Sequence, residues 1–402
     1  MEASWRILLL TSSILVTLAA YASLAIDAVS LAPARFGAAL PPPPYARFAG
    51  QTFEPSAAAF DPATGRVLVF SDHDSILYRY ELTPAGLVLS PGERHDALRL
   101  PDGVQVAKLE GLTRLPSGAF LAVTAFDRPD LRFGRLLRFA YAPGATAQAM
   151  PLEVNDAALA KAVRASSGLP WFKIEALAVD RTGTKVFFGV RSVGESYETP
   201  RDVMFVVRCP LANDRVGPPE AVIPLSTTEA LGGLAEGLSD LQLDAFGDSF
   251  LVLTSHEGTE NTRASHSGHL FRVPAQVLLG AAPPTPFPLG APLRRFWAKP
   301  EGLAVLPSGA VIVVFDDDRD WKHLFAGYEQ SDGLFTVIDL GGALAKTTSK
   351  APDSATRPPA SFVRPSAATP APAPRSHCRC RAPGSASRVL PRPPHARHAA
   401  PP

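Results

Sequence analysis

Lysine and glutamate recur two residues apart in three similar phrases of this 402-residue chain. Each phrase reads large apolar, any residue, Lys, any residue, Glu, small, Leu, and the copies are Val106–Leu112, Trp171–Leu177 and Trp297–Leu303. A repeated carboxylate can bind a hard cation or exchange a proton, and a repeated ammonium group can neutralise a phosphate. The same residues can equally be salt bridges that join parts of the fold.

A second set of charged residues closes the apolar runs of the chain. In each of the three phrases a glycine lies eight residues after the Glu, an apolar run follows it, and a charge ends the run. A fourth copy runs from Glu236 to Gly247, and a fifth, with Ala57 in the Glu position, leads to Gly65. The charged endings are Asp72-His73-Asp74, Asp127-Arg128, Arg191, His256-Glu257 and Asp316-Asp317-Asp318. Aspartate after a strand is also a common turn residue.

The copies predict an all-β fold built from repeats. Their glycines recur at intervals of 53 to 65 residues, and short strands and tight turns at this period are typical of β-propeller blades. We expect a propeller over residues 45–342 with five four-stranded blades, six being the alternative. His95–Leu100 is the expected outer strand of the first blade, Tyr45–Gly50 is the strand that closes the ring, and Asp156–Ala165 is a surface helix.

The propeller geometry predicts where the charged residues meet. The innermost strand of a blade begins on the face where the second strand ends, so both sets should surround one mouth of the central channel. Carboxylates around one axis repel each other unless a cation, a proton or a lysine lies among them. We therefore expect a site for Ca²⁺ or Mg²⁺. The ion would be bound by some of six carboxylates, namely the proposed ligands Asp72, Asp74, Glu175, Asp316 and Asp318, and Glu301.

The same mouth contains residues suited to phosphate-ester hydrolysis. Lys108, Lys173, Lys299 and His73 are the candidate substrate-binding residues, and Arg191, His256 and Glu301 are the candidate catalytic residues. Arg191 has a structural alternative, in which it ties two blades together. The pair His266 and His269, in a polar segment, is interpreted as a surface feature. No Gly-x-Ser-x-Gly elbow is present, which argues against an α/β-hydrolase serine. No P-loop or Gly-x-Gly-x-x-Gly phrase is present either, and no organic cofactor is expected.

The phrases resemble those of a known family. Ser71–Asp74, Lys173–Val179, Glu236–Leu241 and Lys299–Val305 with Phe315–Asp318 are similar to the secreted phytase-like β-propellers, whose domain is described as esterase-like activity of phytase, and to a neighbouring bacterial family of unknown function. The resemblance spans about Phe48 to Leu340. It implies an exported propeller and is compatible with phosphate-ester hydrolysis, but it transfers no catalytic residue to this sequence.

Both ends of the chain differ in composition from the repeats. Ile7–Ile26 carries no charge and follows Arg6, which predicts a signal peptide within residues 1–27, cleaved after Ala20-Tyr21-Ala22, or an uncleaved anchor. Residues 28–44 form a proline-rich linker. Residues 343–402 hold ten Lys and Arg, one acid and 13 of the 41 prolines, which indicates a disordered tail. The positive-inside rule then places the propeller outside the cytoplasm, as a secreted or periplasmic protein or an outward-facing anchored one.

Two classes of function follow from these observations. The first is a binding propeller that holds a ligand, cation or partner at the mouth. The second is a divalent-cation-dependent phosphoesterase, and whether the chain is an enzyme stays open. The net charge of +1, with no basic stripe, argues against a nucleic-acid partner. A small molecule or phosphate ester is the expected ligand, the membrane is contacted only through the N-terminal segment, and no protein partner is indicated.

Overall fold

The chain was analysed in a computed structural model. The structure describes residues 46–47, 54–71, 76–83, 86–89, 98, 100–101, 106–128, 133–141, 148–257, 266–283, 285–296, 298–316 and 334–340. Spatial contacts divide the chain into Met1–Lys350 and Ala351–Pro402, and everything below concerns the first unit. The leader, the linker and the tail predicted from the sequence lie outside the described residues. No described helix has the length and apolar character needed to cross a membrane.

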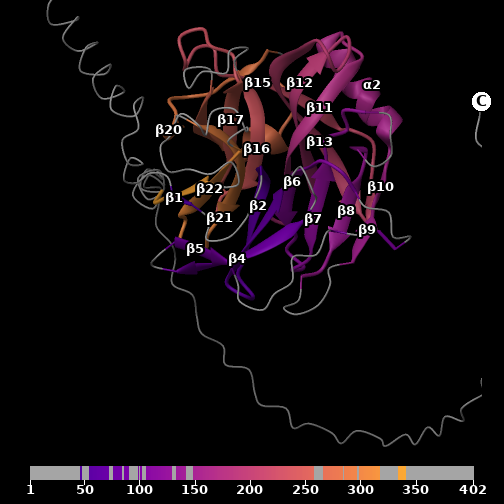
Figure 1. Cartoon of the computed structure of the whole chain (residues 1–402). Helices are drawn as coiled ribbons and strands as arrows, with labels where there is room; N and C mark the ends of the chain where they lie inside the picture. The colour runs from indigo at the N-terminus through magenta and orange to yellow at the C-terminus, as the bar shows by residue number, and fades with distance from the viewer. Residues whose placement is uncertain are drawn as a thin grey trace, which may run out of the picture. The chain divides into compact units, whose positions relative to one another are not determined.

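The described strands form five sheets, whose main strands are antiparallel and which are the blades of a β-propeller (Figure 1). Blade one is built from β2 (Pro55–Asp61), β3 (Arg66–Ser71), β4 (Leu77–Thr83) and β5 (Gly86–Leu89). Blade two is built from β6 (Leu109–Arg114), β7 (Phe120–Thr124), β8 (Leu136–Phe139) and β9 (Ala149–Pro151). The outer strand of blade one is β5, which corrects the prediction that His95–Leu100 takes this place. Of that range the structure describes only Leu98 and Leu100, which are buried and lie in no strand.

Blade three is the largest sheet. Its four main strands are β11 (Trp171–Val179), β12 (Lys185–Gly194), β13 (Pro200–Ala212) and β15 (Ala221–Ser226). Three two-residue strands extend it, namely β10 (Glu153–Val154), β14 (Arg215–Val216) and β19 (Phe287–Pro288). The prediction of four strands in every blade therefore missed the additions to this one.

Blade four and blade five complete the ring. Blade four holds β16 (Gly237–Leu243), β17 (Ser249–Glu257), β18 (His266–Pro274) and β20 (Arg294–Phe296). Blade five holds β21 (Lys299–Val305), β22 (Val311–Asp316), β23 (Leu334–Ile338) and, from the start of the chain, β1 (Ala46–Arg47). Because β1 pairs with β23, the N-terminal strand joins the last blade as predicted and closes the ring, with the two-residue β1 as the outer edge of that blade.

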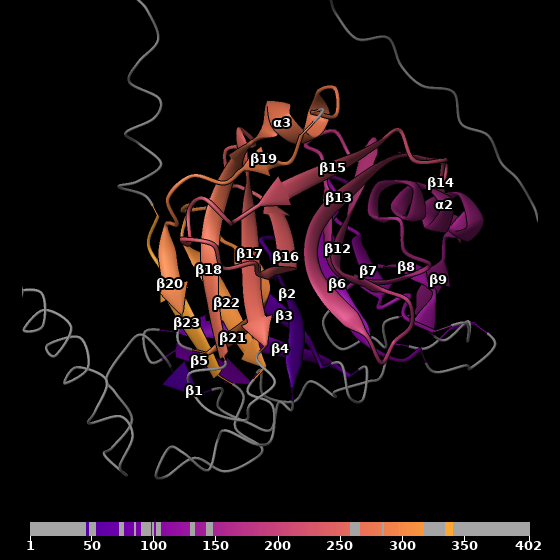
Figure 2. The ribbon, with the colours of Figure 1, turned by 90° about the horizontal axis from the view of Figure 1, so that it is seen from above.

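The innermost strands stand next to each other in the order β2, β6, β11, β16, β21, and β21 returns to β2 (Figure 2). Their side chains and those of the second strands fill the spaces between blades. Five apolar clusters result, one between each pair of neighbouring blades, and Phe120, Phe188, Phe250 and Phe315 are among their fully buried members. Burial of aromatic side chains of this size supplies much of the stability of the ring.

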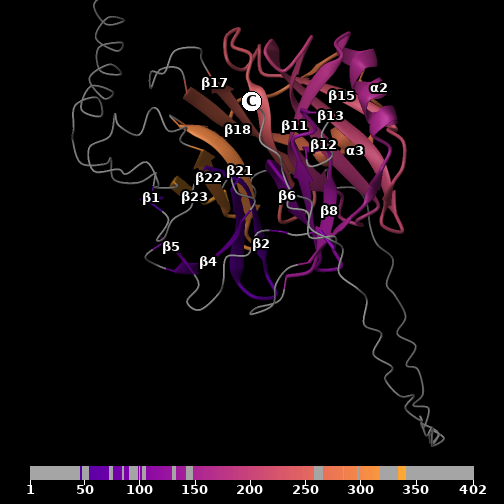
Figure 3. The same ribbon diagram turned by 45° about the vertical axis from the view of Figure 1, so that its right-hand side comes forward.

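The two described helices lie on the outside of the blades (Figure 3). The helix α2 (Asp156–Ser167) confirms the predicted surface helix: the side chain of Asn155 accepts a hydrogen bond from the Ala158 amide, and Gly168 ends the helix at a φ of 76°. The short α3 (Ala275–Leu279) follows β18 and packs against it. Neither helix belongs to the channel.

Candidate functional site

A β-bulge interrupts the innermost strand of every blade at the same level of the channel. The pairing of the first two strands skips one residue, which leaves that residue out of the ladder. The skipped residues are Ser56, Glu110, Glu175, Ser239 and Glu301. A bulge turns the extra side chain away from its regular direction, and bulges often adjoin functional sites. The Glu of the repeated phrase is therefore a bulge residue.

This alignment of blades corrects the sequence alignment in two places. In blade four the residue equivalent to the repeated Glu is Ser239, and Glu236 lies three residues earlier, outside the bulge. In blade one it is Ser56 rather than Ala57, because the turn that follows is one residue longer than in the other blades. Three glutamates and two serines thus occupy the five equivalent positions.

The small residue after each Glu is required by the close approach of neighbouring blades. A Cβ atom added to Gly302 would lie 2.8 Å from the Cα of Ala57 in the next blade, and one added to Gly111 would lie 2.9 Å from the Cβ of Leu177. Contacts this short do not occur between real side chains, so a larger residue would force the inner strands apart. The phrase Glu-small-Leu is therefore a packing rule as well as a charge pattern.

We call the mouth of the channel where the inner strands begin the charged mouth. Oppositely charged side chains alternate around it. Lys108 Nζ lies 3.7 Å from Glu110 and 3.4 Å from Asp127, and Lys173 Nζ lies 3.2 Å from Glu110 and also contacts Glu175. Lys299 Nζ lies 3.0 Å from Glu301 and 3.1 Å from Asp316. We refer to these residues together with Arg191 as the charged belt. It contains the predicted substrate-binding residues Lys108, Lys173 and Lys299.

Arg191 is a buried member of the belt and joins three blades. It is a second bulge residue, skipped in the pairing of β12 with both β11 and β13. Its Nη1 atom donates to Glu175 at 2.6 Å and to Ser255 at 2.8 Å, and lies 3.6 Å from Glu301 of blade five. The Ser255 and Ser239 hydroxyls are 2.7 Å apart. Arg191 is only 3% exposed, so its position matches the structural alternative considered for it, a tie between blades.

The mutual ion pairs shift the pKa values of the belt in opposite directions. Burial alone would raise the pKa of Glu175, but Arg191, Lys173 and Lys299 outweigh it and lower that pKa to about 2. For Glu301, burial together with the nearby Glu175 and Asp316 outweighs the attraction of Lys299 and Arg191 and raises the pKa to about 8. Burial disfavours the charged form of Lys173, yet Glu110 and Glu175 raise its pKa above the ordinary value. Of these two glutamates, Glu301 thus takes up a proton more readily than Glu175.

A separate buried pair lies in blade four, and sequence reasoning misjudged it. Glu236 accepts from the Thr254 hydroxyl, and both of its carboxylate oxygens lie 3.0 Å from Nδ1 of His269. His269 is 5% exposed within β18, so its interpretation as a surface residue was wrong. Its position in β18 directly opposite Thr254 of β17 explains the burial, and that register is not visible in the sequence.

His256, the third candidate catalytic residue, is placed differently from Arg191 and Glu301. It ends β17, and its Nδ1 lies 3.8 Å from Asp202 of blade three. The structure joins it to this neighbour and not to the described residues of the belt. Its side chain is one-third exposed, unlike those of Arg191 and Glu301.

The predicted cation site is only partly covered by the structure. Asp72, Asp74 and Asp318, together with His73, lie outside the described residues. The other proposed ligands, Glu175 and Asp316, each contact Lys or Arg, and the described residues hold no group of three or more His, Cys, Asp or Glu suited to a metal ion. The described part of the proposed ligand set therefore does not fit a calcium or magnesium ion, and the full site stays a prediction.

The sequence matches no family model and no curated protein. Solved structures similar to this chain include a luciferin-regenerating enzyme, at 10% identity, 73% coverage of this chain and 93% of that chain, with a TM-score of 0.40. Another is the calcium-binding protein regucalcin from Agrobacterium tumefaciens, at 14% identity, 72% and 91% coverage and a TM-score of 0.37. A third is the β-propeller domain of Cps50 from Myceliophteria thermophila, at 8% identity, 73% and 100% coverage and a TM-score of 0.34.

These similarities concern the propeller fold alone. Identities of 8 to 14% and TM-scores below 0.5 assign no activity, ion or cofactor to this chain. The resemblance to the phytase-like propellers is supported as far as the propeller, and the finer family assignment rests on the motifs quoted for it.

Proposed function

We propose that this chain is an exported propeller that binds a small anionic molecule, a carboxylate or a phosphate ester, at the charged mouth. Export is part of the proposal because the charge-free segment Ile7–Ile26 behind Arg6 has the composition of a leader. Binding without turnover is the function that the geometry of the belt supports best.

The observation that carries the proposal is the difference in exposure between Lys108 and Lys173 and their carboxylate partners; Lys299, at 9% exposure beside Asp316 at 10%, lies deeper. The side chains of Lys108 and Lys173 are 20% and 18% exposed, whereas those of their partners Glu110, Asp127 and Glu175 are at most 4% exposed. A molecule that enters this mouth therefore meets ammonium groups first, with the carboxylates behind them. Clustered ammonium groups attract and hold anions, and a low local dielectric strengthens the attraction.

An aromatic group beside Lys108 gives the mouth a second recognition element. Trp171 Nε1 donates to the carbonyl of Asp127 at 2.7 Å, and its ring meets that of Tyr197 edge to face. The guanidinium of Arg128 lies 4.9 Å from the centre of the Phe133 ring and 5.1 Å from that of Tyr197. Tyr197 and Arg128 are about half exposed, so they offer a flat face to a ring carried by the ligand.

The alternative, a cation-dependent phosphoesterase, uses the same anion-binding lysines. The belt favours it less, because Arg191 and Glu301 are buried under the lysines and engaged with each other and with Glu175. We keep this activity as a distinct outcome of the experiment below.

The experiment measures anion binding to the purified full chain by calorimetry. The panel contains phosphate esters and carboxylates, each with an uncharged analogue. Lys108→Asn is the test variant, because Lys108 has a φ of 58°, a left-handed conformation that asparagine tolerates, and Arg128 stays near Asp127 after the change. Lys161→Asn, on the exposed face of α2, is the matched control.

We expect an anion of the panel to bind, and we expect Lys108→Asn to raise its dissociation constant about tenfold. The Lys161→Asn control should bind the anion as tightly as the unmodified chain. Circular dichroism checks that both variants fold. If no anion binds, or if both variants lose affinity equally, the proposal is wrong. Release of phosphate that requires Ca²⁺ or Mg²⁺ and stops with chelator would establish the phosphoesterase. A melting temperature raised by calcium without anion binding would instead favour the cation site.

A further inference from the structure

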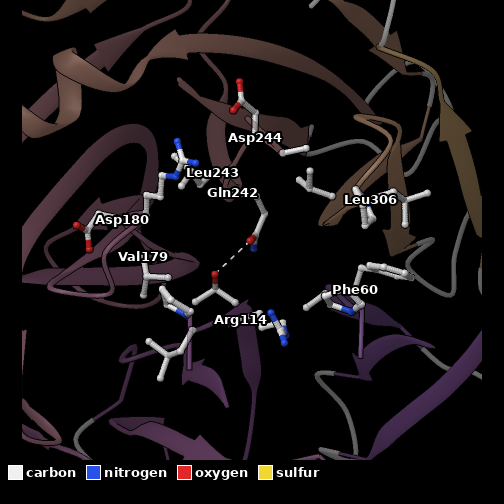
Figure 4. Close-up of a pocket in the computed structure, with 17 residues that line it drawn as sticks. Phe60, Arg114, Val179, Asp180, Gln242, Leu243, Asp244 and Leu306 are labelled. Atoms are coloured by element: carbon white, nitrogen blue, oxygen red, sulfur yellow. Dashed lines mark hydrogen bonds between the residues drawn. The ribbon is translucent and has the colours of Figure 1, made fainter. Parts of the chain in front are cut away.

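A second opening of the channel lies where the inner strands end and turn back into the second strands. We call it the hairpin mouth. It forms a cavity of about 490 Å³, a size typical of small-molecule sites. All five blades contribute residues to its wall (Figure 4). None of the residues singled out from the sequence lines this cavity, and the proposed function does not use it.

The floor of the cavity is a polar plug that closes the channel. Gln242 of β16 reaches across the axis, donates to the Leu112 carbonyl of blade two at 2.7 Å and accepts from Thr113 Oγ1 at 3.3 Å (Figure 4). Just behind it, Asp240 accepts from the Leu303 amide of blade five at 2.6 Å. Both side chains are buried and engaged, so they separate the hairpin mouth from the charged mouth.

The wall of the cavity is largely apolar. It is lined by aliphatic and aromatic side chains and by one proline from each of three turns, including Phe60, Leu115, Val179, Leu306, Pro116 and Pro307. An apolar wall over a polar floor is the usual composition of a site for a small organic molecule. The body of the ligand is therefore expected to be apolar.

The carboxylates at this mouth are already used by the turns. Asp180 accepts from the amides of Thr184 and Lys185, both at 2.7 Å, and Asp244 accepts from those of Phe246 and Asp248, both at 3.1 Å. Figure 4 shows the carboxylates of Asp180 and Asp244 directed away from the middle of the cavity. Their negative charge is stabilised in the turns and is not presented to a molecule inside.

The two arginines of the cavity keep donors available. Arg114 contacts Asp61 through Nε at 3.4 Å, and among the described residues its terminal nitrogens have no hydrogen-bond partner. Arg181 makes one long contact, from Nη1 to the Phe246 carbonyl at 3.4 Å. Guanidinium groups bind carboxylates through paired N–H donors, and Arg114, whose terminal nitrogens remain available, would hold an acidic group at the edge of the apolar cavity.

From the cavity, its apolar wall and the Arg114 guanidinium we infer that the hairpin mouth is a second binding site, for a small molecule with an apolar body and one carboxylate. It is independent of the charged mouth. Arg114, which leans towards blade one, would bind the carboxylate, and the apolar body would lie against Phe60, Val179 and Leu306 above the Gln242 plug. Arg181 leans the other way, towards the Phe246 turn of blade four, and would add only a more distant positive charge.

The test compares 2-naphthoate with uncharged 2-naphthamide, which have the same ring, by calorimetry on the full chain. We expect naphthoate to bind at least about tenfold more tightly than naphthamide. Ala245→Trp, which enlarges a side chain that lines the cavity, should abolish binding. Arg114→Gln should weaken binding about fivefold to tenfold, and Arg181→Gln should weaken it about twofold at most. Ala165→Trp and Arg164→Gln, both on exposed positions of α2, are the matched controls and should bind normally.

Circular dichroism and the melting temperature identify any variant that fails to fold, and if Ala245→Trp or Arg114→Gln does so, the other of these two decides. The inference is overturned if naphthoate does not bind, if naphthamide binds equally well, or if folded Ala245→Trp or Arg114→Gln protein binds like its control. It is also overturned if Lys108→Asn removes the binding, because the probe would then occupy the charged mouth. Since the proposed function is tested on that other mouth, either proposal can fail without the other.

Discussion

The two mouths of the channel hold similar residue types and use them in opposite ways. At the charged mouth, carboxylates lie beneath lysines in a continuous network of ion pairs, whereas at the hairpin mouth Asp180 and Asp244 are bound to the amides of their own turns. The first arrangement joins different blades and the second stabilises one hairpin at a time. The comparison teaches that the partner of a carboxylate decides whether its charge links neighbouring blades or stabilises a single turn.

Replacing Arg191 should produce the largest effect. Arg191→Met leaves Glu175 and Glu301 buried without their shared cation, and breaking a buried ion pair in this way typically costs about 3–5 kcal/mol. Urea unfolding monitored by circular dichroism measures the loss. The matched change at the other mouth, Arg114→Met, should cost less than about 1 kcal/mol because its single pair is partly solvated. Equal losses in the two variants would contradict the distinction between the mouths.

The plug between the mouths gives the next largest effect. Gln242→Leu fills a similar volume but leaves the Leu112 carbonyl and the Thr113 hydroxyl without their partner, which should cost about 1–3 kcal/mol in urea unfolding. Gln242→Glu is the control that keeps the acceptor for Thr113 and loses the donor to Leu112. A fully stable Gln242→Leu protein would show that the channel is closed by packing rather than by hydrogen bonds.

The pH dependence of stability should report on the charged mouth. A carboxyl whose folded pKa is raised stabilises the fold fully below its unfolded pKa of 4.5, and this contribution is lost as the pH rises through about 8. The melting temperature should therefore fall by about 3 °C between pH 5 and pH 9 through Glu301. Glu301→Gln, which cannot ionise, should remove that part of the fall. An identical pH profile in this variant would contradict the shift.

The opposite sign applies to Glu175. Because its folded pKa is lowered to about 2, its stabilising contribution is present above pH 4.5 and is lost as the pH falls through about 2. The two glutamates therefore affect stability at opposite ends of the pH scale. In a plot of melting temperature against pH, the Glu301→Gln variant should still lose stability at low pH, because Glu175 is unchanged.

The smallest effect is expected at the hairpin mouth. Asp61→Asn keeps one oxygen to accept from the Ala63 amide, and its NH2 group can donate to the Thr64 hydroxyl, which reverses that hydrogen bond. Because the change also removes the charge that faces Arg114 only at the rim of the mouth, stability should change by less than about 0.5 kcal/mol. Freed of this counter-charge, Arg114 should bind naphthoate about twofold to threefold more tightly. Unchanged affinity in a folded Asp61→Asn protein would mean that Arg114 does not face the ligand.

Local patterns in the sequence were sufficient for the fold and for one of the mouths. The period of the turn glycines predicted the propeller, its five blades and the strand that closes it, because each blade is built from contiguous residues whose pairing depends on short turns. The repeated Lys-x-Glu phrases predicted the charged mouth for the same reason: equivalent residues of equivalent blades meet around one axis. The outer strand of blade one was missed although its pairing is local: β5 begins at Gly86, close behind the end of β4 at Thr83, and pairs with β4.

Tertiary structure alone decided what these residues contact and which mouth is hollow. Ser239 and Ser56 replace glutamate at the bulges. Ser239 keeps the spacing of eight residues to Gly247, which the sequence shows although Glu236 looks like the better match, whereas only the register of the strands identifies Ser56. Gln242, Arg114 and Arg181 come from separate blades and carry no shared motif, so their meeting at the hairpin mouth follows from the closure of the ring. Sequence determines local hydrogen bonding and periodicity, whereas the pairing of charges and the shape of a cavity depend on side chains that are distant along the chain and become neighbours only when the blades pack.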